Sequence, residues 1–341
     1  MYNWYAQATL CIAYLSDIAG PWPSDQAEYV ERTLALLPGS AWFTRGWTLQ
    51  ELIAPRWVLL FSAEWVMLGW KRPRSDPVTR DDPPNLIESL SEITGIDSSV
   101  LEIPTRHTDR SIAQKMSWAS QRATTRPEDL AYSLLGLFSV NMPLLYGEGA
   151  SKAFMRLQLE IIRRSTDESI FAWKWSLLTS WNGLLALSPE GFRGAGDIMS
   201  LCNEEIYQAS DLKLSGPLAD SRFLAGRPSY LMTNKGLEFR APAWMIRTGS
   251  YNVYVVWLAC ARRSSDEGVQ KHKMHTKRET LQQTSQCCVV LYARSEDDVN
   301  DRVRRAYQWY EHPDESLRTL YPPETWQDVG EKWFEIAQDG R

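Results

Sequence analysis

One acidic residue, Glu51, stands in an otherwise apolar and aromatic stretch, residues 45–55, Arg-Gly-Trp-Thr-Leu-Gln-Glu-Leu-Ile-Ala-Pro. Leu49, Leu52 and Ile53 recur at the three- and four-residue spacing of a helix, which predicts a helical turn with one side packed inward. A tryptophan lies one turn before the carboxylate. A carboxylate beside an aromatic ring at the edge of a core can act as an acid, a base or a stabiliser of positive charge.

A second interpretation of Glu51 is purely structural. The same pattern fits a surface glutamate near a helix end that caps the helix or pairs with Arg45 or Arg56. The residue types and their spacing alone leave both interpretations open.

The other chemistry-bearing patterns predict no second site. His272 and His275 lie in a polar segment without a nearby cluster of Cys or acidic residues, so no metal site is expected. Residues 147–149, Gly-Glu-Gly, lack the Lys-Ser/Thr of a phosphate-binding loop and predict a turn that begins a helix. No Gly-x-Ser-x-Gly pattern supports a serine hydrolase.

Charge and composition narrow the class of protein. The 341 residues include 37 Lys and Arg against 42 Asp and Glu, a net charge of −5, which argues against nucleic acid or an anionic membrane as the main partner. The sequence contains no run of about 18 apolar residues, so no membrane span is predicted. Five cysteines without a CxxC pair are typical of a reducing compartment, so a cytoplasmic protein is expected.

The elements around Glu51 follow from the hydrophobic pattern. Residues 1–8 predict the end of an amphipathic helix, and the continuous apolar run 10–15 predicts a strand buried on both faces, as in a parallel sheet. Residues 28–37 predict a helix, and residues 57–61 predict a strand that turns back into 65–68 as a hairpin.

The rest of the chain divides into a helical part and a strand-rich part. Residues 71–84, rich in Pro and charge, predict a linker or exposed loop. Helices are expected after this segment, at about 85–94, 110–122, 126–138 and 150–164. β-branched and aromatic runs predict strands at 236–240, 251–261 and 287–293, joined in part by a long polar loop at 262–286. The expected class is α+β, with domains 1–62, 63–175 and 176–341.

Two long motifs resemble a known family. Residues 45–55 resemble the closing motif of the fungal HET (heterokaryon incompatibility) domain. A second signature spans residues 116–149 and is similar to the segment that follows the HET domain in many fungal incompatibility proteins. Its parts are Met116-Ser117-Trp118-Ala119-Ser120, Arg122, Thr124-Thr125-Arg126-Pro127-Glu128-Asp129, Ala131-Tyr132-Ser133-Leu134-Leu135-Gly136 and Asn141-Met142-Pro143-Leu144-Leu145-Tyr146-Gly147-Glu148-Gly149.

The resemblance implies an organisation for the chain. HET domains are distant relatives of TIR domains, so residues 1–62 would be the C-terminal part of a partial α/β, TIR-like domain. The Ser-His-Trp and Ile-Asp-x-Cys-Cys motifs that usually begin a HET domain do not occur, and an N-terminally truncated HET domain is therefore expected. A central helical region and a mostly β C-terminal domain would follow. The second signature is expected to couple the two ends of the chain, with Arg122, Arg126, Glu128 and Asp129 as an ion-pair network.

The resemblance also implies a chemistry for Glu51. Residues 47–52 are similar to the Trp-Cys-Leu-x-Glu-Leu segment of plant TIR domains, in which the glutamate cleaves NAD. By this likeness Glu51 would be catalytic, and Trp47, Ser16 and Arg45 would contact NAD as a substrate, without a cofactor. A fixed carboxylate would stabilise the oxocarbenium-like state formed when the nicotinamide–ribose bond breaks.

Two functions fit the resemblance. In both, the protein takes part in fungal non-self recognition and programmed cell death, through protein partners and self-association. In the first it is an NAD-consuming effector that uses Glu51. In the second it is a non-enzymatic signalling or protein-interaction module, which the truncated start favours.

Overall fold

The structure is a computed structural model that describes residues 1–77, 79, 82–174, 184–200, 231–232, 237–247, 251–263, 284–294, 302–310 and 326–336. The chain forms two compact units, which are described separately. The first contains Met1–Arg110, Lys115–Glu160 and Ser188–Glu190, and the second contains Ser111–Gln114, Ile161–Leu187 and Gly191–Arg341. Helices and strands occur together, which confirms the predicted α+β class.

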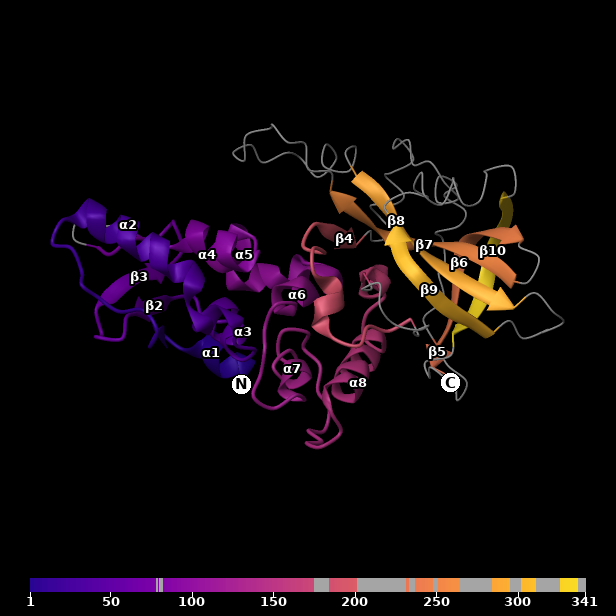
Figure 1. Ribbon diagram of the computed structural model, residues 1–341, viewed down its shortest axis with the longest axis horizontal. Helices are drawn as coiled ribbons and strands as arrows, with labels where there is room; N and C mark the ends of the chain where they lie inside the picture. Colours follow the sequence, from indigo (N-terminus) through magenta and orange to yellow (C-terminus); the bar gives the residue numbers. More distant parts are fainter. Residues whose placement is uncertain are drawn as a thin grey trace. The chain divides into compact units, whose positions relative to one another are not determined.

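A three-stranded sheet in the first unit positions the segment that leads to Glu51 (Figure 1). Its strands are β1 (Cys11–Tyr14), β2 (Val58–Phe61) and β3 (Met67–Lys71). β1 pairs with β2 in parallel, with Cys11 opposite Val58, and β2 pairs with β3 antiparallel. The predicted hairpin is therefore confirmed, with its second strand slightly later than expected.

The prediction that β1 is buried on both faces is wrong. Ala13 is 1% exposed, whereas Ile12 and Tyr14 on the opposite face are 51% and 41% exposed. Among the described residues β1 lies at the edge of its sheet, and the outer face of the strand is left open. The apolar run belongs to a strand that is buried on one face. A local pattern of apolar residues cannot distinguish such a strand from one buried on both faces.

Five short α-helices complete the N-terminal part of this unit: α1 (Tyr2–Gln7), α2 (Gln26–Leu36), α3 (Thr48–Ile53), α4 (Ile87–Thr94) and α5 (Ser98–Glu102). Asp25 caps α2, because its carboxylate accepts the backbone N–H groups of Ala27 and Glu28. α4 ends at Gly95 in the left-handed conformation, φ +67°. α1 buries none of its own residues, so it is the most weakly anchored of the five.

Three further α-helices follow: α6 (Ile112–Ala119), α7 (Asp129–Tyr132) and α8 (Ala150–Ile162). The helix predicted at 126–138 is therefore much too long. Glu128 is the residue before α7 and makes no side-chain cap. Short 3-10 helices lie at Leu37–Gly39, Ala41–Thr44, Pro104–Asp109, Glu168–Phe171 and Pro189–Phe192.

The second unit contains a seven-stranded sheet in the order β4-β7-β8-β9-β10-β6-β5. β6 also pairs with β7, so five of these strands form a closed ring. The strands are β4 (Ile198–Ser200), β5 (Leu231–Met232), β6 (Leu237–Arg247), β7 (Tyr251–Arg263), β8 (Thr284–Arg294), β9 (Arg302–Tyr310) and β10 (Trp326–Ile336). β7 and β8 contain the segments 251–261 and 287–293, whereas most of the loop expected at 262–286 lies outside the described residues.

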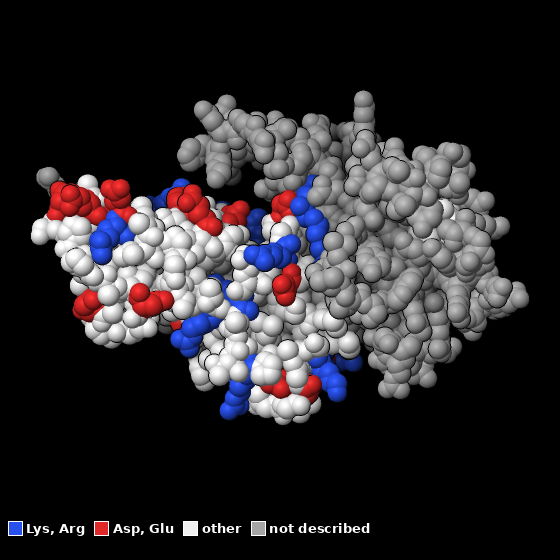
Figure 2. Space-filling model, viewed as in Figure 1, with Lys and Arg blue, Asp and Glu red and all other residues white. Residues whose placement is uncertain are grey.

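The described part of the surface carries charges of both signs. Figure 2 shows acidic and basic side chains interspersed on that part of the face in view, without one continuous basic area. Within the described residues, no helix combines the length and the apolar character needed to cross a membrane.

Candidate functional site around Glu51

The helix α3 carries Glu51 in its first turn, with the carboxylate half-buried. Leu49, Leu52 and Ile53 are at most 1% exposed, which confirms the predicted inward side of the turn. Their burial fixes the rotation of the helix, because these apolar side chains gain most when removed from water. The position of Glu51 at the edge of the core is thus set by its apolar neighbours.

The second signature of the sequence holds this helix in place. The backbone N–H of Gly46 donates to the carbonyl of Ala123 at 2.9 Å, and the N–H of Ala123 donates to the carbonyl of Thr44 at 2.7 Å. A Cβ atom on Gly46 would lie 2.5 Å from Cγ2 of Thr124. Any larger residue at position 46 would therefore require the Thr124 side chain to move.

The buried side chain of Arg122 also connects the segment before α3 to the second signature. Its Nη1 donates to the carbonyl of Arg45 at 2.8 Å and to the hydroxyl of Thr48 at 3.0 Å, and its Nε donates to the carbonyl of Trp118 at 3.1 Å. Burial lowers the pKa of Arg122 to about 10, and the negative charge of Glu51 opposes that shift. The guanidinium therefore links the start of α3 to the second signature and supplies positive charge near Glu51.

The ion-pair network expected among Arg122, Arg126, Glu128 and Asp129 is not what the structure shows. Glu128 accepts the backbone N–H groups of Gly147 and Gly149, both at 2.9 Å. Tyr146 donates its hydroxyl to Asp129, and the guanidinium of Arg126 lies 4.6 Å from the centre of the Tyr146 ring. Each of these charged groups thus fixes a loop backbone or an aromatic side chain.

The Gly-Glu-Gly segment is confirmed as a turn before a helix. Gly147 and Gly149 have φ values of +100° and +85°, a region that favours glycine. Their N–H groups are occupied by the carboxylate of Glu128, and neither is available to a phosphate.

Tyr5 is the direct partner of the Glu51 carboxylate. Its hydroxyl donates to Oε1 of Glu51 at 3.1 Å. Burial and the charge of Glu51 together raise the pKa of Tyr5 to about 12, and the same two causes raise the pKa of Cys11 to about 11. Cys11 is therefore a thiol at neutral pH and a poor nucleophile there.

Arg45 and Arg56, the partners expected if Glu51 has a structural role, do not form an ion pair with it within the described residues. Arg56 pairs with Asp76 at 2.7 Å. The side chain of Arg45 is exposed, and its carbonyl accepts from Arg122. Within the described residues, Glu51 thus has a hydrogen bond to one neutral phenol and no ion pair.

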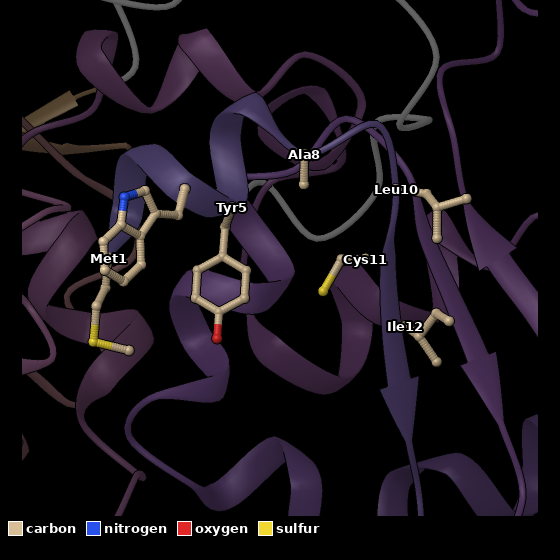
Figure 3. Close-up of a pocket in the computed structure, with 7 residues that line it drawn as sticks. Met1, Tyr5, Ala8, Leu10, Cys11 and Ile12 are labelled. Carbon is tan, nitrogen blue, oxygen red and sulfur yellow. The ribbon is translucent and has the colours of Figure 1, made fainter.

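An open depression of about 520 Å³ adjoins this group and is lined by Met1, Trp4, Tyr5, Ala8, Leu10, Cys11 and Ile12. Figure 3 shows Tyr5 projecting from α1 and Cys11 from the start of β1. Trp4 is 76% exposed, so its ring is available to a ligand. Such a surface suits a flat apolar or aromatic group. Tyr5, which lines the depression, is hydrogen-bonded to the Glu51 carboxylate.

The structure does not gather all the residues predicted to contact a ligand. Trp47 directly precedes α3 and is half-buried. Ser16 lies in the turn after β1, two residues beyond the end of the strand at Tyr14. Within the described residues, no hydrogen bond joins Ser16 to Glu51. Trp42 is 6% exposed and packs against Phe43 in the core.

Lys71 begins the segment 71–84 predicted as a linker or exposed loop, and for this residue the prediction is wrong. It is the last residue of β3, is fully buried, and donates its Nζ to the carbonyl of Pro55 at 2.6 Å. Burial lowers its pKa to about 7. Alternation along the strand places Gly69 and Lys71 on the same face, and this pattern could have predicted the burial of Lys71. The charge of the lysine side chain favoured an exposed position instead.

Within the described residues, no group of three or more His, Cys, Asp or Glu side chains is arranged to hold a metal ion. The predicted absence of a site at His272 and His275 concerns residues that lie outside the described ranges.

Comparisons with known proteins relate part of the chain to one protein of known role. The sequence model of a family described as a domain of unknown function, DUF8212, matches residues 152–183. No solved structure matches the chain. The vegetative incompatibility protein HET-E-1 of Podospora anserina is 39% identical over 161 residues, which are 47% of this chain and 11% of that protein. The chain thus spans about a tenth of the length of this curated relative, and over those residues it is similar to a fungal vegetative incompatibility protein.

Proposed function

We propose that the chain acts in fungal vegetative incompatibility, in the recognition of non-self and the cell death that follows. The observation that carries this proposal is the 39% identity to HET-E-1 over 161 residues. The packing of the second signature against α3 supports it, because the two resembling motifs then form one structural unit. Induced expression in fungal hyphae, with growth as the readout, tests the proposal.

We further propose that Glu51 is a catalytic carboxylate that cleaves NAD. One oxygen of the carboxylate accepts the Tyr5 hydroxyl, and the other has no hydrogen-bond partner among the described residues. The free oxygen would contact the ribose hydroxyls and stabilise the positive charge that develops on the sugar ring. The exposed rings of the adjoining depression would stack on nicotinamide or adenine, with Trp4 as the largest of them.

The test is NAD consumption by the purified chain, measured as release of nicotinamide. Glu51→Gln should abolish the release and leave the circular dichroism spectrum and the melting temperature close to those of the native chain. Glu92→Gln, the same charge change at an exposed position of α4, is the matched control and should keep full activity. Retained activity in Glu51→Gln would remove Glu51 from the mechanism.

A non-enzymatic interaction module is the second candidate function, and the open face of β1 favours it. Ile12 and Tyr14 are 51% and 41% exposed, and the Tyr14 ring stacks on Trp65 at 4.8 Å. Cys11 and Leu15 donate their N–H groups to the β2 side, so the N–H and C=O groups of Ile12 and Tyr14 point to the open edge. An added β-strand with apolar side chains from a protein partner would match both features.

One comparison separates the two candidates. If the chain works by binding, Ile12→Lys should abolish hyphal death and Glu51→Gln should not. If it works by catalysis, Glu51→Gln should abolish hyphal death together with NAD loss.

A further inference from the structure

A second depression, of about 450 Å³, lies in the first unit and has no part in the proposals for Glu51. Segments that follow α3, β3 and α5 form it together with α1. Its polar lining residues are Arg56, Ser75, Glu102, Thr105 and His107, and its apolar lining includes Tyr2, Pro73, Ile103 and Pro104. Four separate stretches of the chain thus meet around one concave surface.

His107 is the buried polar group of this depression, and it is 8% exposed. Its Nδ1 lies 2.7 Å from the carbonyl of Pro104 and 3.2 Å from the Tyr2 hydroxyl. A carbonyl oxygen only accepts, so Nδ1 carries the proton in the neutral ring and Nε2 is left with a lone pair. Within the described residues, Nε2 has no hydrogen-bond partner.

The ring of His107 is held neutral by its surroundings. Burial lowers its pKa, and the Pro104 carbonyl raises it. Smaller effects come from Lys115, which lowers the pKa, and Asp109, which raises it. A neutral imidazole with a bound Nδ1–H is a fixed hydrogen-bond acceptor at Nε2. The depression therefore presents a preset acceptor to any ligand that brings an N–H or O–H donor.

Among the described lining residues of the depression, Glu102 carries the charge that has no ion-pair partner. Arg56 is neutralised by Asp76 at 2.7 Å, and the side chain of Arg74 pairs with Glu88. Within the described residues, Glu102 accepts the backbone N–H of Arg74 at 3.0 Å and has no ion pair. A cation is thus favoured over an anion at this surface.

We propose that this depression binds a primary ammonium group attached to an apolar chain. The ammonium would donate to Nε2 of His107 and to the carboxylate of Glu102, and it has three donors for these acceptors and the Ser75 or Thr105 hydroxyl. The apolar chain would lie against Ile103 and the two prolines, where its methylene groups leave water. The Tyr2 ring offers a further face to the cation.

The experiment titrates the full chain with n-butylammonium chloride and follows the Nε2 resonance of His107 by long-range proton–nitrogen NMR. The resonance should shift in a saturable way over the millimolar range, because Nε2 gains a hydrogen bond. Butyltrimethylammonium has the same charge but no N–H donor, and it should leave the resonance unchanged. Equal shifts with both salts, or none with either, would overturn the proposal.

Two variants test the role of the charge. Glu102→Gln keeps the size of the side chain and should weaken n-butylammonium binding about tenfold, as expected for the loss of a charge-assisted hydrogen bond. Glu92→Gln carries the same charge change on α4 outside the depression and should bind like the native chain. Undiminished binding in a folded Glu102→Gln variant would contradict the assignment.

The ammonium could belong to a free amine or to a lysine of a protein. A parallel titration with Nα-acetyl-lysine amide separates these sources. Tighter binding than n-butylammonium would indicate a lysine side chain, and weaker binding would indicate a free amine. The absence of any saturable shift with both would count against the site.

Discussion

Lys71 brings its amine into the core of the first unit, where, within the described residues, it makes one hydrogen bond, to the Pro55 carbonyl. Its pKa falls to about 7 in the folded protein, whereas the pKa of a free lysine is about 10.4. Between these values the unfolded chain binds more protons than the folded one, so the free energy of unfolding rises with pH across this window. The shift corresponds to a cost of about 4–5 kcal/mol at pH 7, as an order of magnitude.

The first prediction is that Lys71→Met stabilises the protein. The substitution removes the cost of burying the amine and keeps an apolar chain of similar length. The gain in melting temperature should be largest below pH 7, where Lys71 is protonated in both the folded and the unfolded chain, and it should shrink as the pH approaches 10. Lys152→Met, at an exposed position of α8, is the control and should change little. A Lys71→Met protein less stable than the native chain at pH 7 would contradict this account of the buried amine.

The second prediction concerns Cys11 and its distance from Glu51. The Glu51 charge contributes to the raised thiol pKa of about 11, so Glu51→Gln should lower that value by a measurable fraction of a unit. The pH dependence of iodoacetamide labelling, followed by mass spectrometry of the Cys11 peptide, reports the pKa. An unchanged profile would show that the two groups are farther apart than the structure places them.

At the scale of elements, α3 depends on a segment about 75 residues later in the chain. The backbone pairing of Thr44 and Gly46 with Ala123 and the buried Arg122 side chain together join the two motifs. α1, which carries Tyr5, rests on Gly136 of the same signature, where a Cβ atom would come 2.2 Å from Cβ of Tyr2. The second signature therefore supports both partners of the Tyr5–Glu51 hydrogen bond.

The third prediction is that Gly46→Ala destabilises the protein by about 1–3 kcal/mol, since the added methyl group meets Thr124 Cγ2. Adding Thr124→Ser removes that methyl group and keeps the hydroxyl that donates to the Arg126 carbonyl. The double variant should regain most of the loss in urea unfolding. If the two effects simply add, the close approach of these segments is not the cause.

Local patterns predicted elements well where one periodicity dominates. The burial of Leu49, Leu52 and Ile53 followed from helical spacing, and the β2–β3 hairpin followed from two apolar runs. Local patterns gave wrong predictions where contacts with distant parts of the sequence determine burial or helix length. The open face of β1 and the early end of α7 depend on neighbours remote in the sequence. Tyr5 was missed as the partner of Glu51 because 46 residues separate them.

At the scale of the whole molecule, the similarity to HET-E-1 covers 47% of the chain and 11% of that relative. The first unit contains both signatures, Glu51, the open face of β1 and the second depression. A function that resides in the first unit should be sensitive to substitutions at these places and insensitive to exposed controls such as Glu92.

A role in vegetative incompatibility can be tested by hyphal survival after induced expression of the chain in a filamentous fungus. We expect the native chain to arrest growth and kill hyphal cells, and we expect Gly46→Ala, which loosens the junction of the two motifs, to weaken the effect. Normal growth of hyphae that hold the folded native chain in abundance would contradict it.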